Sequence, residues 1–183
     1  SRYQQLVNSL ARHPEVYATI SESARIPNLS ATLSDLALRT GAQEIFLIDA
    51  DGRLLETSEA VDTLPDIRQG DLRRLDYIRT AIDGGLGWSH GLEDREDPRV
   101  FYVARAIFDD DGPVIGAGAA SIAVRTLELE WSFGPEPVAF FDRAGIAFVT
   151  NRPDFAMRRA PALAGSGAPP KNISAAALRP FFD

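Results

Sequence analysis

The segment Gly87–Gly91 (GWSHG) has the G-x-S-x-G pattern that positions a nucleophilic serine in α/β-hydrolases. That chemistry requires a sharp turn from a strand into a helix, and a histidine base that follows the serine in the chain. No histidine follows His90, and His13 is the only other one. We therefore interpret the segment as a strand bracketed by glycines and expect no catalytic residue in this chain.

A second candidate is Gly116–Ser121 (GAGAAS), which resembles part of a dinucleotide-binding loop. The third glycine of that motif is absent, and the apolar run continues through Ile122 to Val124 instead of opening a helix. Small residues in a strand allow close approach by another backbone or by a ligand. The segment therefore predicts a strand, and no cofactor is expected.

Acidic residues cluster at Asp109–Asp111 and at Asp49 with Asp51. Neither cluster has the ligand spacing or the closing glutamate of a calcium loop. Two separate histidines and the absence of cysteine argue against a zinc site. We interpret these aspartates as turn residues and expect no bound metal.

Arg105 lies inside the apolar segment Val100–Phe108. In a strand, Arg105 shares one face with Phe101 and Ile107, while Tyr102 lies on the other face. An arginine with apolar neighbours either pairs with a carboxylate of the fold or faces a cavity and binds a ligand anion. The sequence leaves both interpretations open.

The composition is that of an ordinary folded protein: 183 residues, 45% apolar and 25% charged. A net charge of -7 argues against nucleic acid as a partner. No apolar run approaches the roughly 18 residues of a membrane span. Because the chain begins with Ser1 and ends abruptly, we expect it to be a segment of a longer protein.

A hairpin pattern occurs twice, at Ile45–Ser58 (IFLIDADGRLLETS) and, 93 residues later, at Val138–Asn151 (VAFFDRAGIAFVTN). Each copy has an apolar run, an aspartate, a glycine-dependent turn and a second apolar run, which is typical of two strands joined by a tight turn. The copies align Asp49 with Asp142, Gly52 with Gly145 and Thr57 with Thr150. This repeat predicts two related modules with separate sheets.

Helical spacing of apolar residues covers 1–41, with Pro14 suited to a first turn, Asn28 to a cap and Gly41 to a stop. Further along the chain we expect a polar connection, a short helix, three strands, a second short helix and a terminal loop. These elements are assigned to Val61–Gly70, Leu72–Ile82, Gly87–Gly91, Val100–Phe108, Pro113–Val124, Arg125–Trp131 and Ala160–Lys171. The first module is thus a five-stranded antiparallel sheet with helices against it, an α+β fold.

This order of elements resembles the double Cache sensor regions of bacterial histidine kinases of the C4-dicarboxylate-sensor type, which consist of two PAS-like modules. The resemblance covers Leu33 to Arg158. Its marks are IFLIDADG, the Tyr77–Ala81 helix followed by Gly84, Val114–Gly116, Leu127-Glu128 with Trp131, and FDRAGIAFVTNRPDF at the second hairpin.

The resemblance implies a helical stalk (1–41), a membrane-distal ligand-binding module (42–131) and a membrane-proximal module (132–183) that is incomplete here. It also implies a periplasmic location, flanking transmembrane helices, a homodimeric parent and a small-molecule ligand, such as an organic acid or a related metabolite. The parent is expected to be a two-component sensor histidine kinase. The alternatives are the same input module on a chemoreceptor or a diguanylate cyclase, and a structural dimerisation module without a ligand.

The resemblance places six residues around a ligand pocket: Arg74, Tyr77, Trp88, Tyr102, Arg105 and Ser121. Members that bind dicarboxylates carry an arginine two residues before the helix tyrosine and a lysine inside the final strand. Those positions hold Leu75 and Ser121 here. Because two carboxylates require two cations for tight binding, we expect this chain not to bind succinate.

Overall fold

A computed structural model of the chain describes residues 2–21, 27–58, 70–93, 98–131, 135–163 and 165. The chain divides into two compact units, one of Ser1–His90 with Phe101–Ile122 and the other of Gly91–Val100 with Ala123–Asp183. No helix within the described ranges is long and apolar enough to cross a membrane.

Three helices open the first unit: α1 (Arg2–Ala11), α2 (Pro14–Ser21) and α3 (Leu29–Thr40). As expected, Pro14 begins α2, and Gly41 ends α3 with a φ of 74° and a hydrogen bond from its N–H to the Ala37 carbonyl. Asn28 occupies the N-cap position of α3 in a left-handed conformation, but its side chain does not cap the helix. The expected position of Asn28 as the cap residue is therefore confirmed, and only the side-chain hydrogen bond is not found among the described residues.

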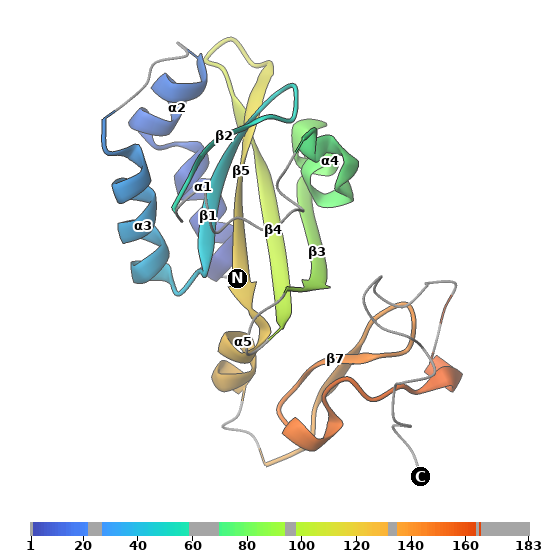
Figure 1. The fold of residues 1–183 in the computed structure, drawn as a ribbon. Coiled ribbons are helices and arrows are strands. Elements are labelled where there is room, and N and C mark those ends of the chain that lie inside the picture. Colours follow the sequence, from blue (N-terminus) through green and yellow to red (C-terminus); the bar gives the residue numbers. More distant parts are fainter. Residues whose placement is uncertain are drawn as a thin grey trace. The chain divides into compact units, whose positions relative to one another are not determined.

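The expected five-stranded sheet is present, with the order β2-β1-β5-β4-β3 (Figure 1). Its strands are β1 (Glu44–Asp49), β2 (Leu54–Thr57), β3 (Leu86–Leu92), β4 (Arg99–Phe108) and β5 (Val114–Ala123). The central strand β5 pairs with β1 in antiparallel register. The fold is therefore α+β, as the sequence predicts.

The N-terminal helices cover one face of this sheet. A β-carbon on Gly118 would lie 2.7 Å from Leu10 of α1 and 3.8 Å from Ile107 of β4, and one on Gly116 would lie 3.3 Å from Ile20 of α2. Side chains alternate along a strand. The even-numbered residues of β5 and the odd-numbered residues of β4 therefore face these helices. We call this the N-helix face.

The segment expected to form one helix over Leu72–Ile82 is interrupted. It consists of a 3₁₀ turn, η3 (Leu72–Arg74), and a helix, α4 (Asp76–Ile82), separated by Leu75 in an extended conformation. The Asp71 carboxylate accepts a hydrogen bond from the Arg73 N–H and so caps the 3₁₀ turn. Local capping thus competes with a continuous helix at this position.

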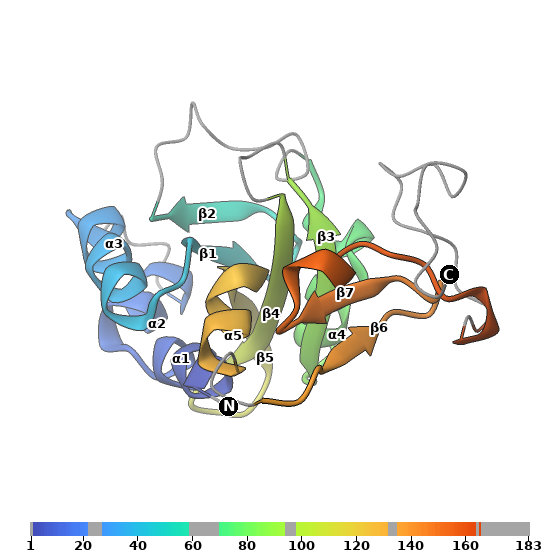
Figure 2. The same cartoon turned by 90° about the horizontal axis from the view of Figure 1, so that it is seen from below.

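The second unit contains the helix α5 (Val124–Trp131) and the hairpin β6 (Ala139–Phe141) and β7 (Ala147–Thr150), a separate two-stranded sheet (Figure 2). Two 3₁₀ turns follow, η4 (Pro153–Phe155) and η5 (Pro161–Leu163). The loop expected at Ala160–Lys171 therefore begins with a 3₁₀ turn. Most of that loop and residues 61–69 of the polar connection lie outside the described residues.

The two hairpins that share the repeated sequence pattern also have the same local geometry. In each, the aligned aspartate accepts hydrogen bonds from the backbone N–H groups two and four residues further on. The bonded sets are Asp49 with Asp51 and Arg53, and Asp142 with Ala144 and Ile146, at 2.8 to 2.9 Å. The turn glycines Gly52 and Gly145 have φ values of 81° and 75°, which other residues rarely adopt.

Candidate ligand-binding site

Two tyrosines join α4 to the sheet. The rings of Tyr77 on α4 and Tyr102 on β4 are stacked, with centroids 5.2 Å apart and an interplanar angle of 16°. Both side chains are buried, at 4% and 3% exposure. Tyr102 therefore lies on the sheet face that α4 covers, which we call the α4 face.

Gly87 allows α4 to lie directly against β3. A β-carbon at this position would lie 1.8 Å from the Tyr77 carbonyl oxygen, well inside any permitted contact. The glycine that resembled part of a hydrolase motif is thus needed for close packing of a helix backbone. This packing fixes where the Tyr77 ring lies on the α4 face.

Ser121 also lies on the α4 face, because it is an odd-numbered residue of β5. It is fully buried, and its hydroxyl has no hydrogen-bond partner among the residues that the structure describes. Ala117 and Ala119 precede it on the same face and are also buried. Small side chains thus line β5 on this face, with one hydroxyl near the end of the strand.

Glu44 is a buried carboxylate that the sequence reasoning missed. It is the residue directly opposite Ser121 in the β1–β5 pairing, so the two side chains share the α4 face. Glu44 is fully buried, and its Oε1 atom accepts a hydrogen bond of 2.8 Å from the Thr57 hydroxyl. The sequence does carry an indication of this site, because Glu44 is a charged residue at the start of an otherwise apolar strand.

Trp88 and Arg105 lie on the opposite face. Trp88 is 64% exposed, and its ring stacks on Phe101 with centroids 6.2 Å apart. Phe101 alternates with Tyr102 along β4. Arg105 is half-buried and lies one pleat from Ile107, which faces the N-terminal helices. The structure therefore does not bring these two residues together with Tyr77 and Tyr102. Within the described residues, Arg105 forms no ion pair, so the carboxylate partner considered above is not found there.

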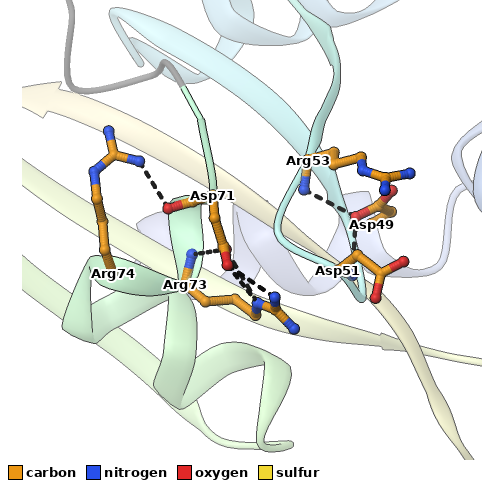
Figure 3. A network of polar contacts seen from close by, with 6 residues as sticks. All are labelled: Asp49, Asp51, Arg53, Asp71, Arg73 and Arg74. Atoms are coloured by element: carbon orange, nitrogen blue, oxygen red, sulfur yellow. Dashed lines mark hydrogen bonds and ion pairs between the residues drawn. The ribbon is translucent and has the colours of Figure 1, made fainter.

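Arg74 lies on η3 in a polar network at the turn of the first hairpin (Figure 3). Its side chain is exposed and donates a hydrogen bond of 2.7 Å to the Asp71 carbonyl. Asp71 is hydrogen-bonded by the Arg73 guanidinium at 2.8 to 3.1 Å, and these bonds lower the pKa of its carboxyl to about 2. Arg74 is thus held at the end of η3 by the backbone carbonyl of Asp71.

The first hairpin also anchors both flanks of residues 59–69. Before this segment, the Ser58 hydroxyl accepts a hydrogen bond of 2.8 Å from the Ile45 N–H. After it, the Leu72 N–H donates to the Gly52 carbonyl at 2.8 Å. Ser58 and Leu72 are therefore both hydrogen-bonded to the first hairpin.

The enzyme-like motifs have structural roles. Ser89 lies in the middle of β3, and its hydroxyl contacts the His90 carbonyl at 3.4 Å, so the strand-to-helix turn of a hydrolase is absent at this serine. Gly116–Ser121 continues as part of β5. Asp109 accepts hydrogen bonds from the Tyr17 hydroxyl and the Asp110 N–H in the β4–β5 turn.

The fold is that of bacterial sensor domains. The structure matches the sensor domain of the V. cholerae histidine kinase DctB with a TM-score of 0.68 and 17% identity, covering 87% of this chain and 62% of that one. It matches the sensory domain of the Campylobacter jejuni chemoreceptor Tlp3 with a TM-score of 0.62 and 20% identity, covering 83% and 62%. The E. coli DcuS sensor domain gives 0.56 and 16% identity, covering 70% and 90%.

No family model matches the chain. A curated relative does: the C4-dicarboxylate transport sensor protein DctB of Pseudomonas aeruginosa is 25% identical over 159 residues. The match covers 84% of this chain but 25% of the relative, so the chain spans about a quarter of that protein. In sequence the chain is therefore similar to DctB, and in fold it is similar to the DctB sensor domain.

Proposed function

We propose that the chain is the extracytoplasmic, small-molecule sensing region of a membrane-bound signalling protein. The observation that carries this proposal is the similarity to DctB over most of the chain, together with the fold shared with solved sensor domains. The parent would be a two-component sensor histidine kinase, anchored by transmembrane helices outside this chain and homodimeric. The chemoreceptor alternative is supported by the Tlp3 match.

The two-module organisation is part of the proposal. The first unit would be the membrane-distal ligand-binding module, and the second hairpin would begin a membrane-proximal module of the double Cache type. The repeat supports this assignment, because β1–β2 and β6–β7 have the same turn geometry in separate sheets. The chain would act by binding and not by catalysis.

The α4 face is the proposed binding surface. Tyr77, Tyr102 and Ser121 belong to it, and Glu44 joins them. Among the described residues, buried groups on this face that can form hydrogen bonds are hydroxyls and one carboxylate. Trp88 and Arg105 are left out because they lie on the N-helix face.

The ligand would be a small organic acid or a related metabolite with no more than one anionic group. The described α4 face lacks a pair of cations, since Leu75 and Ser121 occupy the positions where dicarboxylate-binding relatives have an arginine and a lysine. Amino acids are one such class. The Tlp3 domain has been solved with L-valine, and the Pseudomonas fluorescens CtaA domain with L-isoleucine.

Thermal-shift screening of the purified chain against amino acids, monocarboxylates, dicarboxylates and amines tests the proposal. A ligand at 100 times its Kd should stabilise the fold by about 2.7 kcal/mol. Ser89→Ala should respond like the native chain, because Ser89 is a strand residue without a role in binding. If no compound in these classes raises the melting temperature, the sensing proposal fails.

A further inference from the structure

Three buried polar side chains gather on the α4 face where β1 begins. Glu44 is the first residue of β1, which lies between β2 and β5 (Figure 1). Ser121 of β5 lies directly opposite Glu44, and Thr57 of β2 lies opposite Phe46, two residues further along β1. Because side chains alternate along a strand, all three point to the α4 face. We call Glu44, Thr57 and Ser121 the Glu44 cluster.

The cluster is removed from water but its hydrogen bonding is incomplete. Glu44 and Ser121 are 0% exposed and Thr57 is 1% exposed. The Thr57 hydroxyl donates a hydrogen bond of 2.8 Å to Glu44 Oε1. The Ser121 hydroxyl has no hydrogen-bond partner within the described ranges. Burial of a hydroxyl without a hydrogen bond costs free energy, so its presence calls for an explanation other than stability.

The chemistry of the cluster suits one kind of ligand group. A carboxylate can accept about four hydrogen bonds, and the oxygen of a serine hydroxyl can also accept. A primary ammonium carries a positive charge and three donors, and it has no acceptor. Among the described residues, no lysine or arginine is buried, so no described cation in the interior would repel it. The charge and the donors of an ammonium therefore match the Glu44 cluster.

We propose that Glu44 and Ser121 recognise a primary ammonium group of the ligand, so that the chain senses an amine or an amino acid. The inference rests on the proposed function, because it places the ligand on the α4 face. The ammonium donates one hydrogen bond to the Glu44 carboxylate and another to the Ser121 hydroxyl, while the Thr57 hydroxyl holds the carboxylate. The alternative is a structural cluster that joins β1 to β2 and takes no part in binding.

Compounds that share a carbon skeleton separate the ammonium from the carboxylate of the ligand. One set consists of L-valine, isobutylamine and isovalerate, and two further sets are the corresponding compounds of L-alanine and L-leucine. In calorimetric titrations of the native chain, we expect the amino acid or the amine of at least one set to bind. The acid of that set lacks the ammonium and should bind at least tenfold more weakly.

Binding by the acids alone would overturn this inference and leave the sensing proposal standing. The absence of binding by all nine compounds would also overturn it, whereas the sensing proposal fails only if the wider thermal-shift screen finds no ligand. The two failures are therefore distinguishable.

Glu44→Gln tests the carboxylate with the compound that binds the native chain. The variant keeps an oxygen that can accept the Thr57 hydrogen bond but removes the charge, so it would preserve a structural role and impair recognition of an ammonium. We expect at least tenfold weaker binding, after circular dichroism has shown that the variant is folded. Glu56→Gln is the matched control, because Glu56 lies opposite Leu47, on the other face of the sheet. Its Kd should stay within about threefold of native.

Ser121→Ala provides a second measurement in case Glu44→Gln fails to fold. Because the variant removes a buried hydroxyl that lacks a described partner, it should leave the melting temperature of the ligand-free chain unchanged or raise it. It should also weaken binding of the amine or amino acid by at least threefold. A native Kd in either variant would overturn the inference. A lower melting temperature of ligand-free Ser121→Ala would overturn it as well, because the hydroxyl would then be bonded within the protein.

Discussion

At the scale of single residues, Gly87 sets the distance between α4 and the sheet. Gly87→Ala would place a β-carbon 1.8 Å from the Tyr77 carbonyl oxygen, and backbone atoms cannot move aside as a flexible side chain can. We expect the substitution to lower the free energy of unfolding by about 3 kcal/mol, measured by urea denaturation. Ser89→Ala in the same strand is the control and should change it by less than about 1 kcal/mol. An alanine at residue 87 with native stability would show that α4 does not pack as described.

Asp71 links stability to acidic pH. Hydrogen bonds from Arg73 lower the pKa of the Asp71 carboxyl from 3.8 to about 2. Because the folded-state pKa is the lower one, the stabilisation is present above about pH 4 and is lost as the pH falls toward 2. The difference in melting temperature between the native chain and Asp71→Asn should therefore be constant from pH 5 to 7 and shrink between pH 4 and pH 2. A difference that does not change with pH would contradict this assignment.

The sequence predicts which face of a strand a candidate site residue occupies, but not which other element covers that face. Strand alternation already separates Tyr102 from Arg105, and the structure keeps them on opposite faces. What the sequence could not supply is which face α4 covers, because that depends on a contact between Gly87 and the Tyr77 backbone. Glu44 was missed for a similar reason, since its proximity to Ser121 exists only through the pairing of β1 with β5.

At the scale of elements, the two hairpins should depend equally on their aspartates. Asp49→Ala and Asp142→Ala each remove two hydrogen bonds that backbone N–H groups of the turn donate to the aspartate carboxylate. With roughly 0.5–1.5 kcal/mol per bond, each variant should lose about 1–3 kcal/mol of local stability, measured by hydrogen exchange in its own hairpin.

Asparagine at either position keeps the accepting oxygen and serves as the control. It should retain most of the protection from exchange. If only one of the two alanine variants loses protection from exchange, the two hairpins are not equivalent structural units. The proposal of two related modules would then lose its structural support.

Most helices and strands are predicted by the local sequence pattern. The two exceptions are the break at Leu75 and the position of β1 in the sheet. The strands of the first unit lie close to their expected ranges, since alternation and turn residues mark them. The break at Leu75 was missed because periodicity does not register the Asp71 cap. The placement of β1 between β2 and β5 requires pairing between distant segments, which no local pattern reports.

At the scale of the whole molecule, the similarity to DctB and the residues proposed for binding predict different classes of ligand. The name of the relative refers to C4-dicarboxylates. By the proposed correspondence, Leu75 and Ser121 stand where dicarboxylate-binding relatives have two cations, and each missing partner of a buried charge costs roughly 2–5 kcal/mol. We therefore expect calorimetric titration with succinate or malate at millimolar concentrations to give no binding heat. Micromolar binding of either compound would contradict this expectation.

The central claim is that this chain senses a small molecule on the α4 face of its sheet. The most direct measurement is a calorimetric titration of the strongest ligand from the thermal-shift screen into the native chain, Tyr102→Ala and Arg105→Ala, after circular dichroism has shown that both variants are folded. We predict at least tenfold weaker binding for Tyr102→Ala, a loss of about 1.4 kcal/mol or more, and a Kd within about threefold of native for Arg105→Ala. Binding that survives in Tyr102→Ala but disappears in Arg105→Ala would contradict the account, because it would place the ligand on the N-helix face.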